Sequence, residues 1–140
     1  MQRNSLAVII LVLLLAAVAV ILFLLPPEPP RAEITAVTTD KDRYHSNEVM
    51  NITISVHADR TMDNTTLSIE GIQDRFGRMR LSKTLPASLS AGPANITYDF
   101  RLPSCSSCAG LLPGTYEINV TLFRNGAVLS NMTQSVKLEK

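Results

Sequence analysis

The clearest structural signal in this chain is residues 115–138, TYEINVTLFRNGAVLSNMTQSVKL. Apolar and polar residues alternate on both sides of Asn125-Gly126, as they do in strands that bury one face. The Asn-Gly dipeptide favours a two-residue turn, because both central positions of a type I′ turn need a positive φ. These residues therefore predict a β-hairpin with strands at 115–124 and 128–138.

The same period of two extends upstream from this hairpin to residue 32. It predicts five further strands, at residues 32–39, 48–58, 65–72, 78–85 and 94–102. Polar or Gly/Pro-rich turns separate the strands, and no sustained helical stripe occurs after residue 25. Seven short strands in about 110 residues predict one all-β domain at residues 32–140, a seven-stranded Ig-like antiparallel β-sandwich.

The N-terminal region has a different pattern. Residues 6–25, LAVIILVLLLAAVAVILFLL, contain no polar side chain, and as a helix they would span roughly 30 Å, the thickness of a bilayer core. The apolar part of a cleaved signal peptide is shorter, and a cut after Ala17-Val18-Ala19 would leave an apolar stub in water. We therefore predict a retained, single-pass transmembrane signal-anchor helix that contacts membrane lipid, with residues 1–5 as a cytoplasmic tail.

Residues 26–31 separate this helix from the domain. They begin PPEPP, and proline cannot continue a helix but favours the extended polyproline II conformation. We expect a semi-rigid spacer that holds the domain above the membrane.

The side of the membrane is indicated by N-x-[ST] glycosylation motifs, since the flanking positive charges are ambiguous. Five of the eight asparagines lie in such a motif, where chance would give about one or two. The alternation places four of them on the polar faces of strands and one in a polar turn, so all are available to a glycan. We predict an extracytoplasmic glycoprotein domain of eukaryotic or archaeal type, with candidate sites Asn51, Asn64, Asn95, Asn119 and Asn131.

Two local motifs sharpen the expected fold. Residues 112–116, LPGTY, resemble the tyrosine corner of Greek-key sandwiches, in which a Tyr near the start of a strand bonds back to the backbone. Asp40, Lys41, Tyr44 and Glu48 resemble a "DK-x-x-Y-x-x-x-E" entry to the second strand of macroglobulin-type and other Ig-like domains of archaeal cell-surface proteins. The resemblance covers residues 32–140 and implies an architectural role in adhesion, spacing or docking.

Cys105-Ser106-Ser107-Cys108 is the motif best suited to carry redox or metal chemistry. Haem attachment would need His at position 109, which is Ala, and a zinc site would need ligands beyond the two cysteines. The motif lies between Pro103 and Pro113 in a predicted loop. We favour a structural disulfide between Cys105 and Cys108, while a redox thiol pair and a metal site remain alternatives.

Charged residues outside this loop suggest one possible docking patch. Arg75, Phe76, Arg78, Arg80 and Lys83 combine basic charge with an aromatic ring, although Lys and Arg also protect the edges of sheets. Calcium would need six to eight oxygen ligands, more than Asp40, Asp42 and Glu48 supply, so we expect solvated turn charges there. His57 is expected on a solvent-facing strand position.

The composition limits the possible functions. Thirteen Lys and Arg against twelve Asp and Glu give no electrostatic reason to expect nucleic acid as a partner. No P-loop, HExxH, nucleophile elbow or dinucleotide motif occurs, so we expect neither an enzyme nor a cofactor. The leading hypothesis is a membrane-anchored extracellular module with a structural, adhesion or protein-docking role and an unidentified envelope partner. The alternatives are an accessory subunit of a membrane complex and a thiol-redox or metal-delivery protein.

Overall fold

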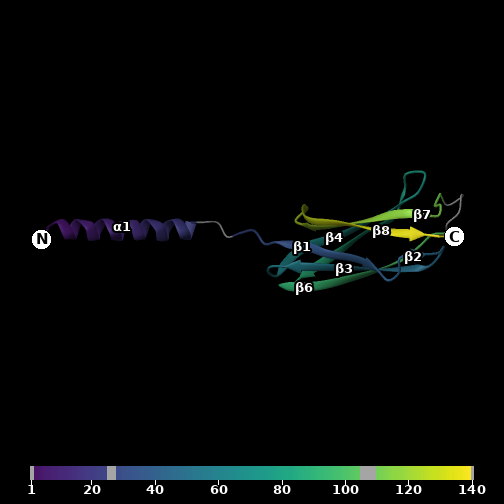
Figure 1. Cartoon of the computed structure of the whole chain (residues 1–140), viewed down its shortest axis with the longest axis horizontal. Helices are drawn as coiled ribbons and strands as arrows, with labels where there is room; N and C mark the ends of the chain where they lie inside the picture. The colour runs from purple at the N-terminus through teal and green to yellow at the C-terminus, as the bar shows by residue number, and fades with distance from the viewer. Residues whose placement is uncertain (1, 25–27, 105–109, 140) are drawn as a thin grey trace.

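The computed structural model describes residues 2–24, 28–104 and 110–139, with helix side chains described at residues 10–22 and 24. One helix is followed by a β-sandwich that lies apart from it (Figure 1). The elements are α1 (Gln2–Leu24), β1 (Ala32–Thr39), β2 (Arg43–Tyr44), β3 (Val49–Ala58), β4 (Met62–Gln73), β5 (Met79–Leu89), β6 (Gly92–Arg101), β7 (Gly114–Arg124) and β8 (Ala127–Leu138).

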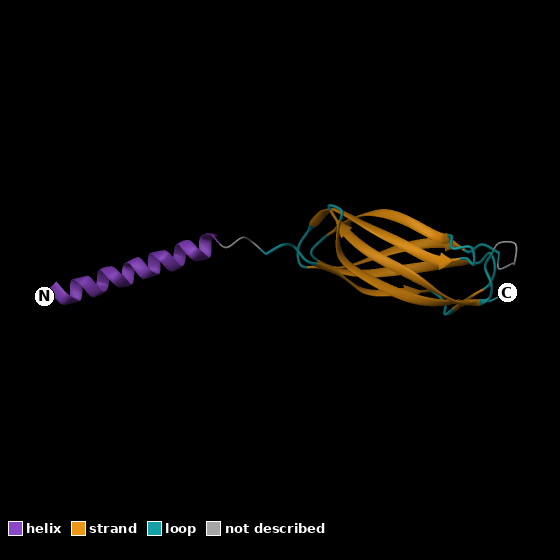
Figure 2. Ribbon diagram, turned by 90° about the horizontal axis from the view of Figure 1, so that it is seen from above, coloured by secondary structure: helices purple, strands orange, loops and turns teal. Residues whose placement is uncertain are grey.

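The strands form two sheets that pack face to face (Figure 2). Sheet A has the order β1-β3-β6, and sheet B has the order β2-β8-β7-β4-β5. All pairs are antiparallel except β2 with β8, which run parallel. The predicted two-layer sandwich is therefore confirmed, but its description as seven-stranded and wholly antiparallel is wrong. The described residues contain eight strands, and the extra one is the two-residue β2.

The hydrophobic core lies between the sheets and follows the predicted alternation. Sheet A contributes Met50, Ile52 and Ile54, each with no exposed surface, and sheet B contributes equally buried side chains such as Leu67 and Ile118. The intervening residues of β3 and β7 face outward, because successive side chains of a strand point to opposite faces. Within sheet B, the backbone of β7 lies close to Gly71 on β4, where an added Cβ would lie 2.3 Å from the Glu117 carbonyl oxygen.

The local backbone confirms one predicted turn and corrects another. Asn125 and Gly126 both have positive φ, 50° and 81°, as the type I′ hairpin requires. Asn64 was expected in a turn, but it lies inside β4 with φ 57°, at a register shift between Met62 and Thr65. This β-bulge lets β4 begin earlier than the sequence pattern indicated.

Helix α1 presents its described side chains to solvent, with exposures from 50% at Ile10 to 76% at Leu24 among the large apolar ones. Within the described residues, no helix is both long and apolar enough to cross a membrane. The predicted transmembrane helix is therefore not confirmed. What the structure establishes at this end of the chain is a single N-terminal helix.

Candidate functional site

The segment that connects β1 to β3 is fixed by the motif found in the sequence. Tyr44 is completely buried, and its hydroxyl donates to Asp40 Oδ1 over 2.7 Å and accepts from the Lys41 backbone N–H over 2.9 Å. Asp40 Oδ1 also accepts from the Asn51 N–H at the start of β3, over 2.8 Å. A single carboxylate thus joins the turn to two strands.

Glu48 is the fourth residue that fixes this turn. We call the set of Asp40, Lys41, Tyr44 and Glu48 the turn lock. Its carboxylate accepts from the His45 N–H over 2.9 Å and pairs with Lys41 Nζ at 3.1 Å. The role of the motif is therefore structural, because each of its four side chains contacts another part of the same turn.

The ionisation of the turn lock follows from these contacts. Burial, and then the hydrogen bond to Asp40, raise the pKa of Tyr44 to about 12. The Tyr44 hydroxyl and the Asn51 N–H lower the pKa of Asp40, and the His45 N–H and Lys41 lower the pKa of Glu48. Among the described residues, no group of three or more His, Cys, Asp and Glu is placed to hold a metal ion.

A second lock surrounds Asp74 in the turn between β4 and β5, and the sequence analysis missed it. The Asp74 side chain has no exposed surface. Its Oδ1 accepts from the N–H groups of Phe76 and Arg78 over 2.8 and 3.0 Å, and its Oδ2 lies 3.0 Å from Arg78 Nε and 2.9 Å from Arg80 Nε. Burial raises the pKa of Asp74, but these N–H donors and Arg78 outweigh it and lower the pKa overall. The sequence did contain a signal for this turn, because Asp is favoured at the first position of a β-turn and Gly at the fourth, as in Asp74 and Gly77.

The contacts of Asp74 involve two arginines of the predicted docking patch. Arg78 and Arg80 neutralise a buried carboxylate, so they are not simply surface charges. Phe76 remains 58% exposed and lies within cation–π distance of two guanidinium groups, with Arg75 at 4.8 Å and Arg78 at 5.2 Å from the ring centroid. Arg75, Phe76 and Arg78 therefore form one tip, which we call the Phe76 tip.

Lys83 does not belong to this tip. It lies farther along β5, opposite the fully buried Ile69, and so has the phase of a core-facing residue although it is exposed. An inward-phased charge on an outer strand is a known protection against strand pairing. The structure thus brings Arg75, Phe76 and Arg78 together at the tip, holds Arg80 beside Arg78 through Asp74, and places Lys83 farther along β5.

The tyrosine corner is confirmed. The Tyr116 hydroxyl donates to the Leu112 carbonyl over 2.7 Å and accepts from the Leu112 N–H over 3.1 Å. It thereby fixes the entry to β7. Cys105 and Cys108 lie outside the described residues, so their predicted disulfide stays a prediction.

The predicted glycosylation motifs occupy outer surfaces of both sheets. Asn64, Asn95, Asn119 and Asn131 are exposed and Asn51 is half-buried. On sheet B, Asn119 stands opposite Thr133 and Asn131 opposite Thr121, so two motifs face each other across β7 and β8. On sheet A, Asn51 donates to Asp99 over 2.6 Å, and Asn95 accepts from Ser55 over 2.8 Å. Each Asn has the outward phase that the alternation predicted, apart from the bulged Asn64.

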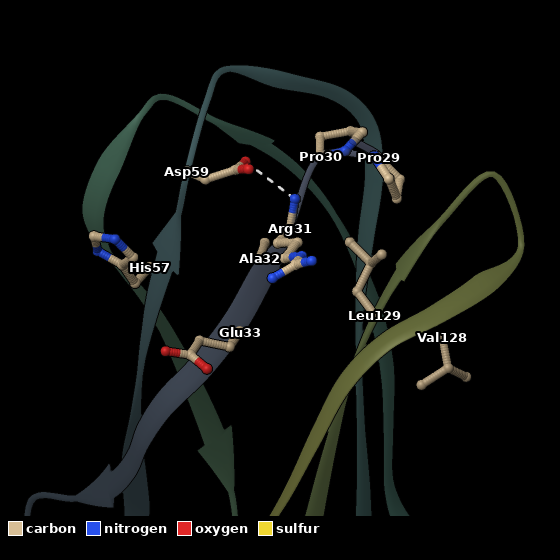
Figure 3. A pocket seen from close by; sticks show the side chains of 9 residues that line it. All are labelled: Pro29, Pro30, Arg31, Ala32, Glu33, His57, Asp59, Val128 and Leu129. Atoms are coloured by element: carbon tan, nitrogen blue, oxygen red, sulfur yellow. Dashed lines mark hydrogen bonds between the residues drawn. The ribbon is translucent and has the colours of Figure 1, made fainter. Parts of the chain in front are cut away.

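A cavity of about 550 Å³ lies where the spacer meets the sandwich (Figure 3). It is lined by Pro29, Pro30, Arg31, Ala32, Glu33, His57, Asp59, Val128 and Leu129. Two of the lining residues bond to each other, since the Arg31 N–H donates to Asp59 Oδ1 and the Asp59 N–H donates to the Arg31 carbonyl, both over 3.0 Å. His57 is exposed, as expected, and pairs across the strands with Glu33. The two hydrogen bonds between Arg31 and Asp59, one to the Asp59 side chain and one between backbone groups, join the end of the spacer to the residue that follows β3.

Solved structures show similarity at the level of the fold. The CARDB domain of the PF1109 protein from Pyrococcus furiosus, in complex with di-metal ions, matches with a TM-score of 0.51 and 14% identity over 79% of this chain and 88% of that chain. A cycloisomaltooligosaccharide glucanotransferase from Paenibacillus sp. matches with a TM-score of 0.60 and 15% identity, over 78% of this chain and 14% of that chain. Spo0M, a sporulation control protein from Bacillus subtilis, matches with a TM-score of 0.55 and 13% identity, over 81% of this chain and 51% of that chain.

These similarities define the class of the domain. It is a β-sandwich structurally similar to CARDB and Ig-like domains. This chain spans only a small part of several matched proteins, including 14% of the glucanotransferase. No protein-family model and no curated protein matches the sequence.

Proposed function

We propose that this chain is a structural module of the cell surface that docks or spaces a protein partner and performs no catalysis. The observation that carries the proposal is the use of its ionisable side chains. Asp40, Glu48 and Asp74 all accept hydrogen bonds that fix turns at one end of the sandwich. These groups hold the scaffold in one shape, which suits a binding surface better than a reaction centre.

We propose further that the domain lies outside the cytoplasm. The support comes from the five glycosylation motifs, from the outward phase of four of their asparagines and from the exposure of the bulged Asn64. The N-terminal apolar sequence supports attachment to a membrane, although the described residues contain no helix long and apolar enough to cross one. The spacer and its Arg31–Asp59 contacts would then hold the sandwich at a fixed distance from the surface.

The Phe76 tip is the proposed docking surface. An exposed aromatic ring with two guanidinium groups close to it combines apolar area with positive charge, and aromatic and Arg side chains dominate the energetics of protein interfaces. The tip lies at the end of the sandwich remote from the spacer, because β4 runs away from Met62, which follows the Asp59 end of β3. No glycosylation motif occurs in the β4–β5 turn, so glycans on the sheet faces would leave it uncovered.

The metal reported for the PF1109 domain is not part of this proposal. That domain is described as a complex with di-metal ions. In this chain, the acidic side chains at Asp40, Glu48 and Asp74 are occupied by donors from the chain itself, and the described residues contain no metal-binding group of three. Cys105 and Cys108 lie outside those residues, and the thiol-redox and metal-delivery alternative concerns them alone.

The test is gentle detergent extraction from native membranes, followed by mass spectrometry of the chain and of its partners. We expect a membrane fraction, a mass above that of the sequence that falls after glycan removal, and a co-purifying protein. Replacing Phe76 by Ala should release that partner, whereas Lys83→Ala, which alters a charge away from the tip, should retain it. Recovery in the soluble fraction at the unmodified mass would refute the surface proposal. Stoichiometric recovery with a multi-subunit enzyme or transporter would instead support the accessory-subunit alternative.

A further inference from the structure

Strand β6 is an open edge of sheet A. It has ten residues, pairs on one side with β3 over its whole length, and ends the strand order β1-β3-β6. The β3–β6 register runs from Ala58↔Gly92 to Val49↔Arg101 without a shift. An outer strand leaves a row of backbone N–H and C=O groups unpaired on its free side, and a regular strand presents that row as a template for another strand.

The other edges of the sandwich are protected. Strand β1 has a register shift between Ile34 and Ala36 and lies against β8, where the Ile34 N–H donates to Ser130 Oγ over 3.0 Å. Strand β2 has only two residues. Strand β5 carries Pro86, which has no N–H, and the inward-phased Lys83. Bulges, short strands, prolines and inward charges are the devices by which proteins block edge pairing.

Strand β6 has no bulge, proline or inward-phased charge between Ala94 and Arg101. Its core-facing positions carry Ala94, Ile96, Tyr98 and Phe100, and its one proline is the second residue of the strand. These four side chains pack on the core but are only partly buried, unlike the fully buried set on the adjacent β3. Sheet A has three strands against five in sheet B. An added strand beside β6 would cover the exposed parts of these side chains and reduce this difference.

We propose that the occupant of this edge is a second copy of the chain, which pairs antiparallel through its own β6 about a two-fold axis at Thr97. Nearly full overlap of two ten-residue strands requires an axis close to this position. With the axis at Thr97, Ala94 faces Phe100 of the other copy and Ile96 faces Tyr98, so that a smaller side chain meets a larger one at each step.

The polar face accepts the same register. Asp99 faces Asn95 of the second copy, and Arg101 faces Pro93, so no two like charges stand opposite each other. The two three-stranded sheets then join into one sheet of six strands. A two-fold contact of this kind uses the same surface on both copies, and its geometry closes the assembly at a dimer.

The direction of β6 determines how such a dimer lies. Gly92 pairs with Ala58, which pairs with Ala32, so β6 begins at the end of the sandwich that follows the spacer. Antiparallel pairing therefore places the two N-terminal helices at opposite ends of the dimer. If the proposed surface attachment holds, the contact joins two opposing surfaces and not two neighbours on one surface.

The experiment is disulfide trapping of the full chain in detergent, made in a host without N-glycosylation and with Cys105 and Cys108 replaced by serine. In the proposed register, two Thr97→Cys residues stand directly opposite, at about 4.5–5.5 Å between Cα atoms, within the range of a disulfide. Asn95→Cys is the matched control, because it lies on the same face and its two copies are about 14 Å apart. Mild oxidation should give at least about tenfold more dimer from Thr97→Cys than from Asn95→Cys.

Mixing Asn95→Cys chains with Asp99→Cys chains should restore the cross-link, since these positions face each other in this register. A second test keeps the wild-type cysteines and adds a charge. Tyr98→Lys should abolish the dimer, as measured by sedimentation and by subunit exchange. Thr84→Lys, on the exposed face of β5, should leave the dimer intact. Equal trapping of Thr97→Cys and Asn95→Cys, or no trapping of either, would overturn the proposal. A dimer that survives Tyr98→Lys would do the same.

Discussion

Replacing Tyr44 by Phe tests whether the DK-x-x-Y-x-x-x-E motif is a turn lock. The change keeps the buried ring and removes only the hydroxyl, which bonds Asp40 at 2.7 Å and the Lys41 N–H at 2.9 Å. A hydrogen bond to a charged group contributes about 1.5–3 kcal/mol, and the exposure of Asp40 places this one near the lower end. We expect the free energy of unfolding to fall by about 1.5–2 kcal/mol. For a sandwich of this size, the Tm should fall by about 6–8 °C.

The pH dependence of this loss gives a sharper test. The pKa of Tyr44 rises from 10.0 to about 12 on folding, so its contribution is complete below pH 10 and is lost as the pH rises through 12. The pKa of Asp40 is lowered from 3.8, so its contribution is present above that value and is lost as the pH falls. The difference between wild type and Tyr44→Phe should therefore be largest near neutral pH and shrink at both extremes.

The assay is urea unfolding of the full chain in mild detergent, followed by circular dichroism across this pH range. Tyr98→Phe is the matched control, because the Tyr98 hydroxyl forms no hydrogen bond with the described part of the chain and its loss should change the midpoint little. The turn-lock interpretation fails if the two variants lose the same stability, or if the loss at Tyr44 does not vary with pH.

Three further perturbations test the scaffold by urea unfolding. Gly71→Ala should lower the unfolding free energy by at least about 3 kcal/mol, because its Cβ would meet the β7 backbone at 2.3 Å, whereas Gly114→Ala, with nothing within 4 Å, should be nearly neutral; equal effects would exclude the close approach. Asp74→Asn should reduce the loss of stability as the pH falls from 7 to well below 3.8, since the lowered pKa of Asp74 contributes stability that is complete above 3.8 and is lost progressively below it; an unchanged acid slope would contradict this. Tyr116→Phe should cost about 1–2 kcal/mol through its two bonds to Leu112, and a neutral effect would show that the corner is not needed.

Much of the fold follows from short-range pattern. The alternation in residues 49–58 and 114–124 fixed which side chains face the core, because a strand has a strict period of two. The hairpin at Asn125-Gly126 was predictable because its backbone needs residues that tolerate positive φ. Strand β2 gave no such signal, since two residues have no period and Arg43–Tyr44 are ordered by pairing with Lys137 and Leu138, almost a hundred positions away.

The candidate sites also differ in how far the sequence alone could predict them. The tyrosine corner and the turn lock could be found in the sequence because their partners lie within a few residues of each other. The docking role of the basic residues stays a prediction, and the pairing of Arg80 with Asp74 could not be predicted from the sequence, because it depends on how β5 returns from the turn. The role of Lys83 in protecting the sheet edge could be inferred only from the structure, which pairs it with the buried Ile69 on β4.

By itself, the sequence determined the apolar N-terminal segment, the strand periodicity, the hairpin and the outward phase of most glycosylation motifs. Each of these is a property of neighbouring residues and of local backbone geometry. Only the tertiary structure decided which strands share a sheet, which acidic groups are occupied, and that β6 is left as the unprotected edge. Those features depend on contacts between segments far apart in the chain, and their energies arise only when the two sheets have closed on one core.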